Sequence, residues 1–369
     1  MCERTRIQSY EREYNMKIGD IDKNLAVESH IKEQDIVWYN VKEAPFRIDG
    51  LWQKEPGKPF LRLPEDVAKN VSDGVYNLNF HTAGGRIRFT TNTKHIALLA
   101  KMPKTPTMPH ITWLGQSGFD LYRHDNGHYE FISPFIAEYR DDHYESIHYM
   151  DGQWHSYTIN MPLYDSVDEV YIGLSGDAEL KEPEPYTYEK PVLYYGSSIT
   201  QGGCASRPGN AYQAVISRKY DCNFINLGFS GSAKGEPAMA DYLATIDSSV
   251  FVMDYDYNAP TPDHLRATHH EVYRKYREAH PDTPIIRISK PDFRIDSEVD
   301  NARRMIVMES FLEARKAGDK RVYFVDGASL FGGEFRDSCT VDGCHPNDLG
   351  FHRMAMVIGE VVGHALRLK

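Results

Sequence analysis

The stretch that decides the fold is Val192-Leu193-Tyr194-Tyr195-Gly196-Ser197-Ser198-Ile199-Thr200-Gln201-Gly202-Gly203. Its first four residues are apolar, β-branched or aromatic, which favours a buried strand. The glycines and serines that follow favour a tight turn, and residues 211–219 behind them have a helical pattern. A strand, a tight turn and a helix form the first half of a β–α–β unit, so this stretch predicts a parallel sheet.

The rest of the C-terminal half repeats this alternation. Further strands are predicted at 224–226, 250–253, 285–288 and 322–325, and helices at 211–219, 238–245, 265–278, 299–316 and 348–366. Parallel strands joined by helices require those helices to cover the faces of the sheet. We therefore expect an α/β domain over residues 191–369, with helices on both faces of its sheet.

The residues before 191 have a different pattern. Short β-rich runs lie at 36–39, 74–80, 86–89, 95–99, 154–159 and 169–174, with turn residues between them. Alternating apolar and polar residues favour an antiparallel sandwich, and no helix-period segment of convincing length interrupts residues 36–176. We predict a β-sandwich domain over 35–180, a linker over 181–190 that contains Pro183 and Pro185, and a polar N-terminal arm over 1–34.

Composition excludes several classes of protein. The chain has 369 residues, which favours two domains, and its 42 basic against 53 acidic residues give a net charge of −11. Nucleic-acid binding relies on Lys and Arg, so such a partner is not expected. No apolar run reaches the roughly 18–20 residues that span a membrane, and the N-terminus has no apolar signal core. We expect a cytoplasmic protein with no membrane partner, and the oligomeric state stays open.

The cysteines do not indicate disulfides or a metal site. Their number is odd, and no two have C-x-x-C spacing; they are Cys2, Cys204, Cys222, Cys339 and Cys344. A disulfide framework is typical of small secreted domains with an even set of cysteines. We therefore expect reduced thiols, and neither a metal nor an organic cofactor.

Polar segments follow four of the predicted strands. They lie at 196–203, 226–232, 254–260 and 342–346. Each segment alone is typical of an ordinary turn or helix cap. In an open parallel sheet, however, ligands bind beyond the carboxyl ends of the strands. Four such segments in order therefore predict one functional site at that edge.

These segments resemble a known family. Gly-Ser-Ser-Ile-Thr-Gln-Gly at 196–202, Asn-x-Gly-x-Ser-Gly at 226–231, Asp-Tyr-Asn at 256–258 and Asp-x-x-His-Pro at 342–346 are similar to the four blocks of SGNH (GDSL-type) serine hydrolases. Upstream, Ser117-Gly118-Phe119-Asp120-Leu121-Tyr122 resembles the Gly-x-Asp-Leu-Tyr signature of a domain that precedes one SGNH subgroup. The resemblance implies a flavodoxin-like parallel sheet preceded by a jelly-roll-like all-β sandwich. We expect the Asp120 segment at the domain junction, rimming the active site.

The resemblance also implies catalytic roles. Ser198 is the expected nucleophile, His345 its general base, and Asp342 the carboxylate that orients the imidazole. The backbone N–H groups of Ser198 and Gly231 and the side chain of Asn258 are the expected oxyanion hole. The chemistry is consistent, because a serine hydroxyl is a weak nucleophile that needs a nearby base, and histidine titrates near neutrality.

Two departures from the family pattern leave questions open. Ser197 stands where the family has an aspartate, so it competes with Ser198 for the role of nucleophile. The third block has Asp256 and Ala259 around Asn258, where the family pattern is Gly-x-Asn-Asp. Asp254 and Asp256 are interpreted either as polar pocket residues or as caps of a neighbouring helix.

We therefore expect a serine-dependent esterase that hydrolyses O-acyl esters, of short acetyl-like chains, on a carbohydrate or small molecule through an acyl-enzyme at Ser198. Two alternatives stay open. The same acyl-enzyme can transfer its acyl group to an alcohol or sugar, since the sequence does not say how well water competes with an acceptor. The protein can also be a carbohydrate-binding module with an inactive hydrolase domain.

Overall fold

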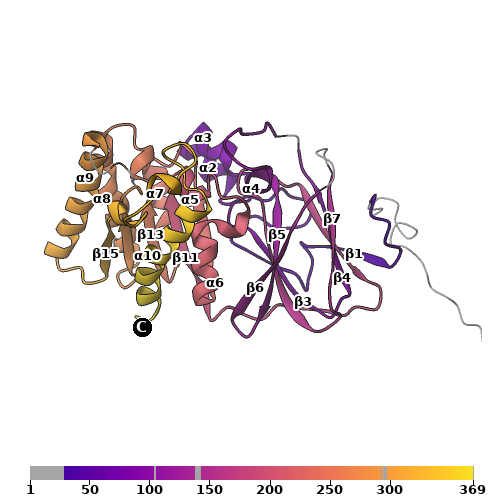
Figure 1. Ribbon diagram of the computed structural model, residues 1–369. Helices are drawn as coiled ribbons and strands as arrows, with labels where there is room; N and C mark the ends of the chain where they lie inside the picture. The colour runs from indigo at the N-terminus through magenta and orange to yellow at the C-terminus, as the bar shows by residue number, and fades with distance from the viewer. Residues whose placement is uncertain (1–28, 104, 138–142, 292–293, 295–296, 369) are drawn as a thin grey trace, which may run out of the picture.

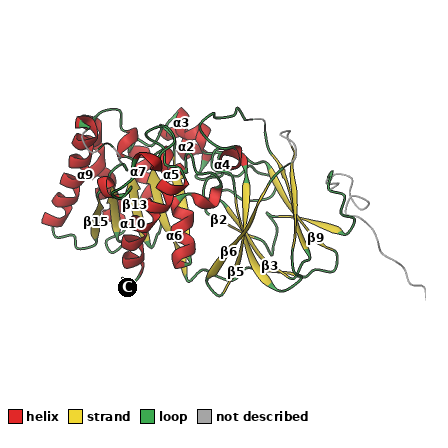
Figure 2. Cartoon of the chain, viewed as in Figure 1, coloured by secondary structure: helices red, strands yellow, loops and turns green. Residues whose placement is uncertain are grey.

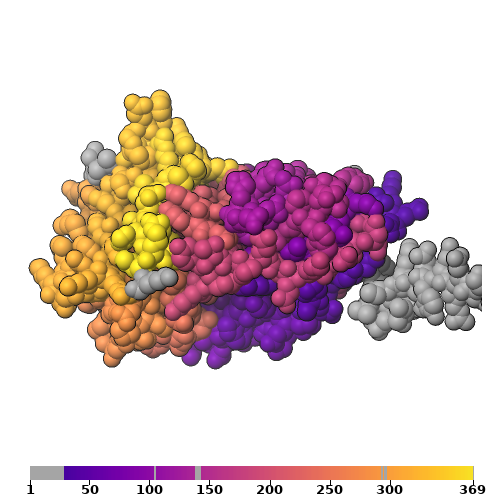
Figure 3. Space-filling view, turned by 90° about the horizontal axis from the view of Figure 1, so that it is seen from below, coloured from indigo at the N-terminus to yellow at the C-terminus, as the bar shows by residue number. Residues whose placement is uncertain are grey.

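The computed structural model describes residues 29–103, 105–137, 143–291, 294 and 297–368. Most of the predicted N-terminal arm, residues 1–28, lies outside these ranges. The described chain forms two parts, one rich in strands and one in which helices surround a sheet (Figures 1 and 2). In the space-filling view the C-terminal part, coloured from rose to yellow, lies directly against the magenta to indigo residues of the other part (Figure 3).

The C-terminal part contains one parallel sheet. Its strands are β11 (Tyr188–Gly196), β12 (Cys222–Gly228), β13 (Val250–Asp254), β14 (Ile285–Ile288) and β15 (Val322–Val325). They are hydrogen-bonded in the order β12-β11-β13-β14-β15, and every neighbouring pair is parallel. This order is that of a flavodoxin-like fold, whose ligand site lies where the order reverses, beside the first strand. The predicted fold of this part is confirmed.

Helices cover both faces of this sheet. On one side lie α5 (Ser198–Gln201), α6 (Tyr212–Tyr220) and α10 (Asp348–Leu366), and on the other α7 (Pro237–Leu243), α8 (Pro262–Ala279) and α9 (Glu298–Lys316). Along β11, Val192 and Tyr194 join the first apolar cluster, whereas Leu193 and Tyr195 join the second. This burial on two sides explains why the strand is apolar throughout. Within the described ranges, each helix is too short or too polar to cross a lipid bilayer.

The strand-rich part is a sandwich of two antiparallel sheets. One contains β1 (Ile36–Asn40), β9 (Glu169–Ser175), β4 (His95–Lys101) and β7 (His143–Tyr149) in that order. The other contains β10 (Leu180–Lys181), β3 (Arg86–Thr91), β8 (His155–Asn160), β5 (Phe119–Asp125) and β6 (His128–Phe135), with β2 (Arg47–Asp49) also paired to β3. Their inner faces enclose one apolar core, which includes Phe89, Leu98 and Ile172. The predicted β-sandwich is confirmed.

The strand predicted at 74–80 is wrong, and three short helices of five to seven residues lie between residues 36 and 176. The chain forms α2 (Glu65–Val71), α3 (Asp73–Leu78) and α4 (Trp113–Ser117) there, and α3 replaces the strand predicted at 74–80. The Ser72 hydroxyl accepts the N–H of Val75 and caps α3. Ala68 and Val75 pack in the apolar cluster beneath α7 and α8 of the other part. Docking onto that distant surface overrides the local β-propensity.

Four short 3-10 helices complete the described structure, namely η2 (Pro208–Asn210), η3 (Asp256–Asn258), η4 (Gly327–Ser329) and η5 (Asp337–Cys339).

Asp120 lies at the junction of the two parts, as expected. Its Oδ2 accepts hydrogen bonds from Arg207 Nη1 at 2.7 Å and from the Gly209 N–H at 2.8 Å. Its Oδ1 accepts one from Asn160 Nδ2 at 2.7 Å, and the residue is fully buried. Nearby, a Cβ on Gly115 would lie only 2.0 Å from the carbonyl oxygen of Ala205, so α4 packs directly on the segment that follows α5.

Candidate active site

Ser198 begins α5 immediately after β11 ends at Gly196. A Cβ on Gly196 would lie 2.0 Å from Thr200 Oγ1 and 2.3 Å from the carbonyl oxygen of Asp254, so the turn requires glycine. The Ser197 hydroxyl accepts the N–H of Ile199 at 3.2 Å and caps α5. The Ser198 Oγ lies 2.9 Å from His345 Nε2. Of the two adjacent serines, Ser198 is therefore the one that contacts a base.

His345 is held by the loop that precedes α10. The Asp342 Oδ1 accepts the N–H groups of Cys344 at 3.0 Å and His345 at 2.8 Å, and its Oδ2 lies 2.7 Å from His345 Nδ1. Burial alone would raise the pKa of Asp342, but the hydrogen bonds from His345 and Cys344 lower it to about 2. The carboxylate is therefore ionised at neutral pH and can only accept, which places the imidazole proton on Nδ1. His345 Nε2 is then the acceptor for the Ser198 hydroxyl.

Gly231 lies on the loop that follows β12. The ends of β11 and β12 are adjacent, since Gly196 pairs with Gly228. The loop is fixed by two hydrogen bonds, from the Phe229 N–H to the Gly196 carbonyl at 2.9 Å and from the Ser230 N–H to Gln201 Oε1 at 3.0 Å. Gly231 itself is exposed with φ +67°, and a Cβ there would meet nothing within 4 Å. Its backbone therefore borders open space beside the strand ends.

Asn258 comes from the strand end on the other side of β11. It is the last residue of η3, which follows β13, and β13 pairs with β11 at Gly196 and Asp254. Its Nδ2 donates to the Phe229 carbonyl oxygen at 2.9 Å. This bond ties Asn258 to the loop that carries Gly231. Because an amide group has two N–H donors, one remains after this bond.

Asp254 and Asp256 anchor the strand ends, and neither is hydrogen-bonded to Ser198 or His345. The Asp254 Oδ2 accepts the hydroxyls of Thr200 at 3.0 Å and Tyr212 at 3.1 Å, which ties β13 to α5 and α6. Burial, with a smaller contribution from Asp256, raises the pKa of Asp254 to about 8. This carboxyl is therefore held in its neutral form at pH 7.

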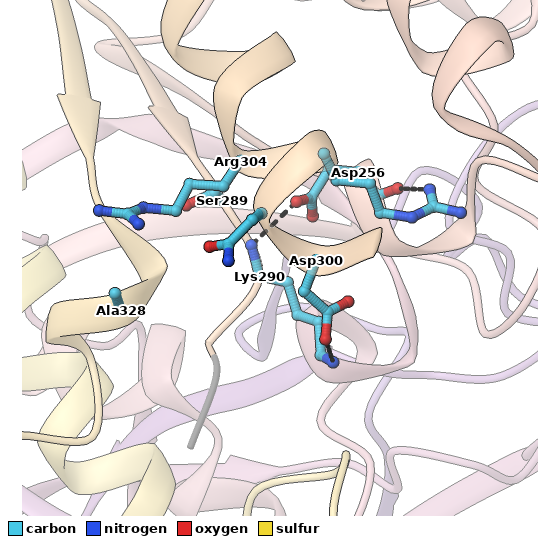
Figure 4. Close-up of a pocket in the computed structure, with 8 residues that line it drawn as sticks. Asp256, Ser289, Lys290, Asp300, Arg304 and Ala328 are labelled. Carbon is cyan, nitrogen blue, oxygen red and sulfur yellow. Dashed lines mark hydrogen bonds and ion pairs between the residues drawn. The ribbon is translucent and has the colours of Figure 1, made fainter. Parts of the chain in front are cut away.

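Asp256 lines a small polar pocket beside η3 (Figure 4). Its carboxylate accepts the backbone N–H of Lys290 at 3.0 Å, and Arg303 Nη1 donates to its carbonyl oxygen at 2.7 Å. The Lys290 ammonium lies 3.4 Å from Asp300 in the same pocket. Neither Ser198 nor His345 is among the residues that line this pocket.

Two residues of the N-terminal part, Tyr164 and Arg62, contact the backbone of the site. The sequence motifs did not identify either of them as a site residue. The Tyr164 hydroxyl donates to the Ser198 carbonyl oxygen at 3.0 Å, and its ring is buried. Arg62 donates to the carbonyl oxygens of Gly228 and Leu78 and lies over the Phe229 ring, 4.3 Å from its centroid. The sequence does carry a signal for Arg62, because a cation inside the apolar run 60–63 is typical of a buried arginine that is paired with acceptors.

Two family models match the chain. The model of the GDSL-like lipase/acylhydrolase family matches residues 189–363, and that of the GxDLY N-terminus of SGNH-hydrolase-type esterases matches residues 36–180. No curated protein matches the chain.

Several solved structures are similar over most of the chain. A Bacteroides ovatus protein described as a GDSL-like lipase is 31% identical, with a TM-score of 0.81, over 90% of this chain and 99% of its own. The salicylyl-acyltransferase SsfX3 of a tetracycline biosynthetic pathway is 18% identical, with a TM-score of 0.75, over 91% and 99%. A family two carbohydrate esterase from Cellvibrio japonicus is 12% identical, with a TM-score of 0.59, over 90% and 98%.

Proposed function

Since the chain belongs to the GDSL-like lipase/acylhydrolase family and is a carboxylic ester hydrolase, we propose that it cleaves O-acyl esters through an acyl-enzyme on Ser198. The observation that carries this proposal is the pair of hydrogen bonds that joins Asp342, His345 and Ser198, at 2.7 and 2.9 Å. A serine hydroxyl needs such a base to attack a carbonyl carbon at neutral pH.

In the first step, the Ser198 Oγ attacks the acyl carbonyl and its proton passes to His345 Nε2. Asp342 stabilises the imidazolium that forms and keeps the ring in its orientation. The negative oxygen of the tetrahedral intermediate accepts hydrogen bonds from the backbone N–H groups of Ser198 and Gly231 and from the Asn258 amide. His345 then gives its proton to the leaving alcohol, and a water molecule activated by the same base hydrolyses the acyl-enzyme.

We propose a short acyl chain on a carbohydrate or small alcohol as the substrate. Support comes from proteins of the same fold, which include family two carbohydrate esterases and an acetyl xylan esterase from Butyrivibrio proteoclasticus with a TM-score of 0.56. The His345 side chain is 21% exposed, so an alcohol can approach the base from solvent, although Ser198 itself is buried.

Acyl transfer is the second candidate, because SsfX3, a salicylyl-acyltransferase, matches almost the whole chain in fold. Both reactions share the acyl-enzyme and differ only in the acceptor. Product analysis of an aryl acetate reaction, with and without added sugar alcohols, separates them. Free acetate as the main product in both mixtures supports hydrolysis, whereas an acetylated acceptor that forms faster than acetate supports transfer.

The mechanism is tested by comparing Ser198→Ala with Ser197→Ala in an aryl acetate assay. Ser198→Ala removes the nucleophile, and we expect kcat to fall roughly 10⁴-fold or more. Ser197→Ala removes only a helix cap, which costs about 0.5–2 kcal/mol of stability, and we expect it to keep most of the activity. Wild-type activity in Ser198→Ala would overturn the mechanism. Carbohydrate binding without turnover in the wild type would favour an inactive binding protein.

A further inference from the structure

We propose that His110, Cys204 and His345 form a site for Zn²⁺ whose occupation switches off the esterase. The binding part of this inference stands on geometry alone, while the inhibition part rests on the proposed role of His345. The three side chains come from distant segments: His110 precedes α4 in the N-terminal part, Cys204 follows α5, and His345 precedes α10. The site is thus assembled only where the two parts of the chain meet.

The three potential ligand atoms lie close together. One nitrogen from each histidine and the Cys204 Sγ are all within 4.8 Å of one another, the only such His, Cys, Asp or Glu group among the described residues. The ring centroids of His110 and His345 are 5.7 Å apart. A Cβ on Gly203 would lie 3.2 Å from His345 Cδ2, so the absence of a side chain there lets the backbone beside Cys204 approach His345 closely.

The ligand types select a borderline-soft cation. Imidazole nitrogen and thiolate sulfur are the preferred ligands of Zn²⁺, at roughly 2.0–2.1 and 2.3 Å, which places ligand atoms roughly 3.3–3.6 Å apart in a tetrahedral site. The ligand atoms therefore need to close by up to about 1.2–1.5 Å, and His110, which is only partly buried, can supply most of this movement. Ca²⁺ and Mg²⁺ prefer oxygen ligands and do not fit this set.

Asp342 is already placed as the carboxylate that accepts a hydrogen bond from a zinc-binding histidine. Its carboxylate is bonded to His345 Nδ1 at 2.7 Å, the carboxylate–histidine arrangement that orients many zinc ligands. It holds the ring proton on Nδ1, so Nε2, which lies 2.9 Å from the Ser198 Oγ, is the nitrogen of His345 that has a lone pair for a cation. That lone pair can accept the Ser198 proton or bind the cation, but cannot do both. Zinc binding and catalysis are therefore mutually exclusive at His345.

The electron pairs and the proton are all accounted for in the binding step. Zn²⁺ gains lone pairs from the neutral nitrogens of His110 and His345 and from Cys204. The Cys204 thiol releases its proton to solvent as the S–Zn bond forms. A water molecule completes the fourth position, since three protein ligands are available.

Binding is tested with Co²⁺, which takes zinc's place and gives a near-ultraviolet sulfur-to-cobalt absorption when a thiolate binds it. We expect this absorption at one equivalent in the wild-type protein, its loss in Cys204→Ser, and its weakening in His110→Ala. Cys344→Ser is the matched control, since Cys344 adjoins His345 but lies outside the group, and it should keep the absorption. Absence of the absorption in the wild type, or its persistence in Cys204→Ser, would overturn the site.

Inhibition is tested by titrating Zn²⁺ into the aryl acetate assay. At saturation we expect turnover to fall by about 10²-fold or more, because a general base contributes roughly 10²–10⁴. A chelator should restore it. Cys204→Ser and His110→Ala, checked for native circular dichroism, should need at least about tenfold more zinc, the smallest loss typical of weakened zinc sites. Equal zinc sensitivity in wild type and both variants would contradict the proposal. Cobalt binding in a protein that lacks esterase activity would refute only the proposed function.

Discussion

Ser197 and Ser198 are identical side chains one position apart, and their surroundings give them different tasks. The Ser197 hydroxyl accepts a backbone N–H from α5, whereas the Ser198 hydroxyl faces His345 Nε2 at 2.9 Å. The first side chain is therefore occupied by a structural hydrogen bond, and the second can transfer its proton. The Asn258 side chain also has a structural bond. One of its two amide N–H groups donates to the Phe229 carbonyl oxygen, and the other remains available.

We expect Asn258→Ala to lower kcat by roughly 10²–10³, with a much smaller change in KM, because an oxyanion donor acts mainly in the transition state. Steady-state kinetics with an aryl acetate measure both constants. Asn258→Asp is a control of equal size that replaces the donor by a carboxylate, and its loss should be at least as large. A kcat within about twofold of wild type in Asn258→Ala would exclude this residue from the oxyanion hole.

Asp254 should make folding stability fall as pH rises. Burial raises its pKa to about 8 in the folded chain, against about 3.9 when unfolded. Between these values the folded state holds a proton that the unfolded state has lost, so the stability gained from Asp254 is present below about pH 4 and is lost toward about pH 8. Asp254→Asn removes this dependence. Urea unfolding at several pH values should show that the free energy of unfolding of Asp254→Asn rises relative to that of wild type as the pH increases across this interval. A difference in free energy that does not change with pH would contradict the assignment.

At the scale of elements, the sequence predicted the C-terminal sheet well and the helices at 65–78 badly. The strands at 250–253, 285–288 and 322–325 are short runs of mostly apolar residues bounded by turns, with Arg287 as the one charged member, so the local pattern was sufficient. Val75 lies in a run that favours a strand locally, but it is buried in the apolar cluster of the other part of the chain. With 7 and 6 residues, α2 and α3 are also too short for a helical period to be recognised in the sequence.

Arg62, which precedes α2, supports the end of β12 and the loop that carries Gly231. Arg62→Lys keeps the charge but loses the planar set of donors that reaches the carbonyls of Gly228 and Leu78. We expect a loss of about 1–3 kcal/mol in the free energy of unfolding, as for buried groups left unsatisfied, and a larger effect on kcat than on KM. Arg47→Lys, at a partly exposed arginine paired with Glu189, is the control. Unchanged kcat and stability in Arg62→Lys would show that Arg62 does not support the site.

At the scale of the whole molecule, the N-terminal part supplies contacts that complete the site. Tyr164 is bonded to the Ser198 carbonyl, and Asp120 holds the segment at Arg207 and Gly209 that follows α5. The sequence identified Ser198, Asp342 and His345 through short motifs at strand ends. It could not identify Tyr164 or His110 as neighbours of the site, because their positions depend on how the two parts dock.

The buried pair of Asp120 and Arg207 should therefore matter to both stability and activity. Asp120→Asn keeps the shape of the side chain but leaves Arg207 without its counter-charge, and breaking a buried pair costs up to about 3–5 kcal/mol, less here because Arg207 is 20% exposed. We expect a lower Tm and reduced kcat together. Asp177→Asn, at a solvent-exposed pair with Lys94, is the matched control and should leave both unchanged. An unaltered Tm in Asp120→Asn would show that the junction does not depend on this pair.

The central claim is that Ser198 is an activated nucleophile, and labelling with a fluorophosphonate probe tests it most directly. The probe should modify one serine in the wild-type protein, and mass spectrometry should place it on Ser198 of the peptide that contains both Ser197 and Ser198. Labelling should vanish in Ser198→Ala and persist in Ser197→Ala. A label on Ser197, or no label on a protein shown to be folded, would contradict the account.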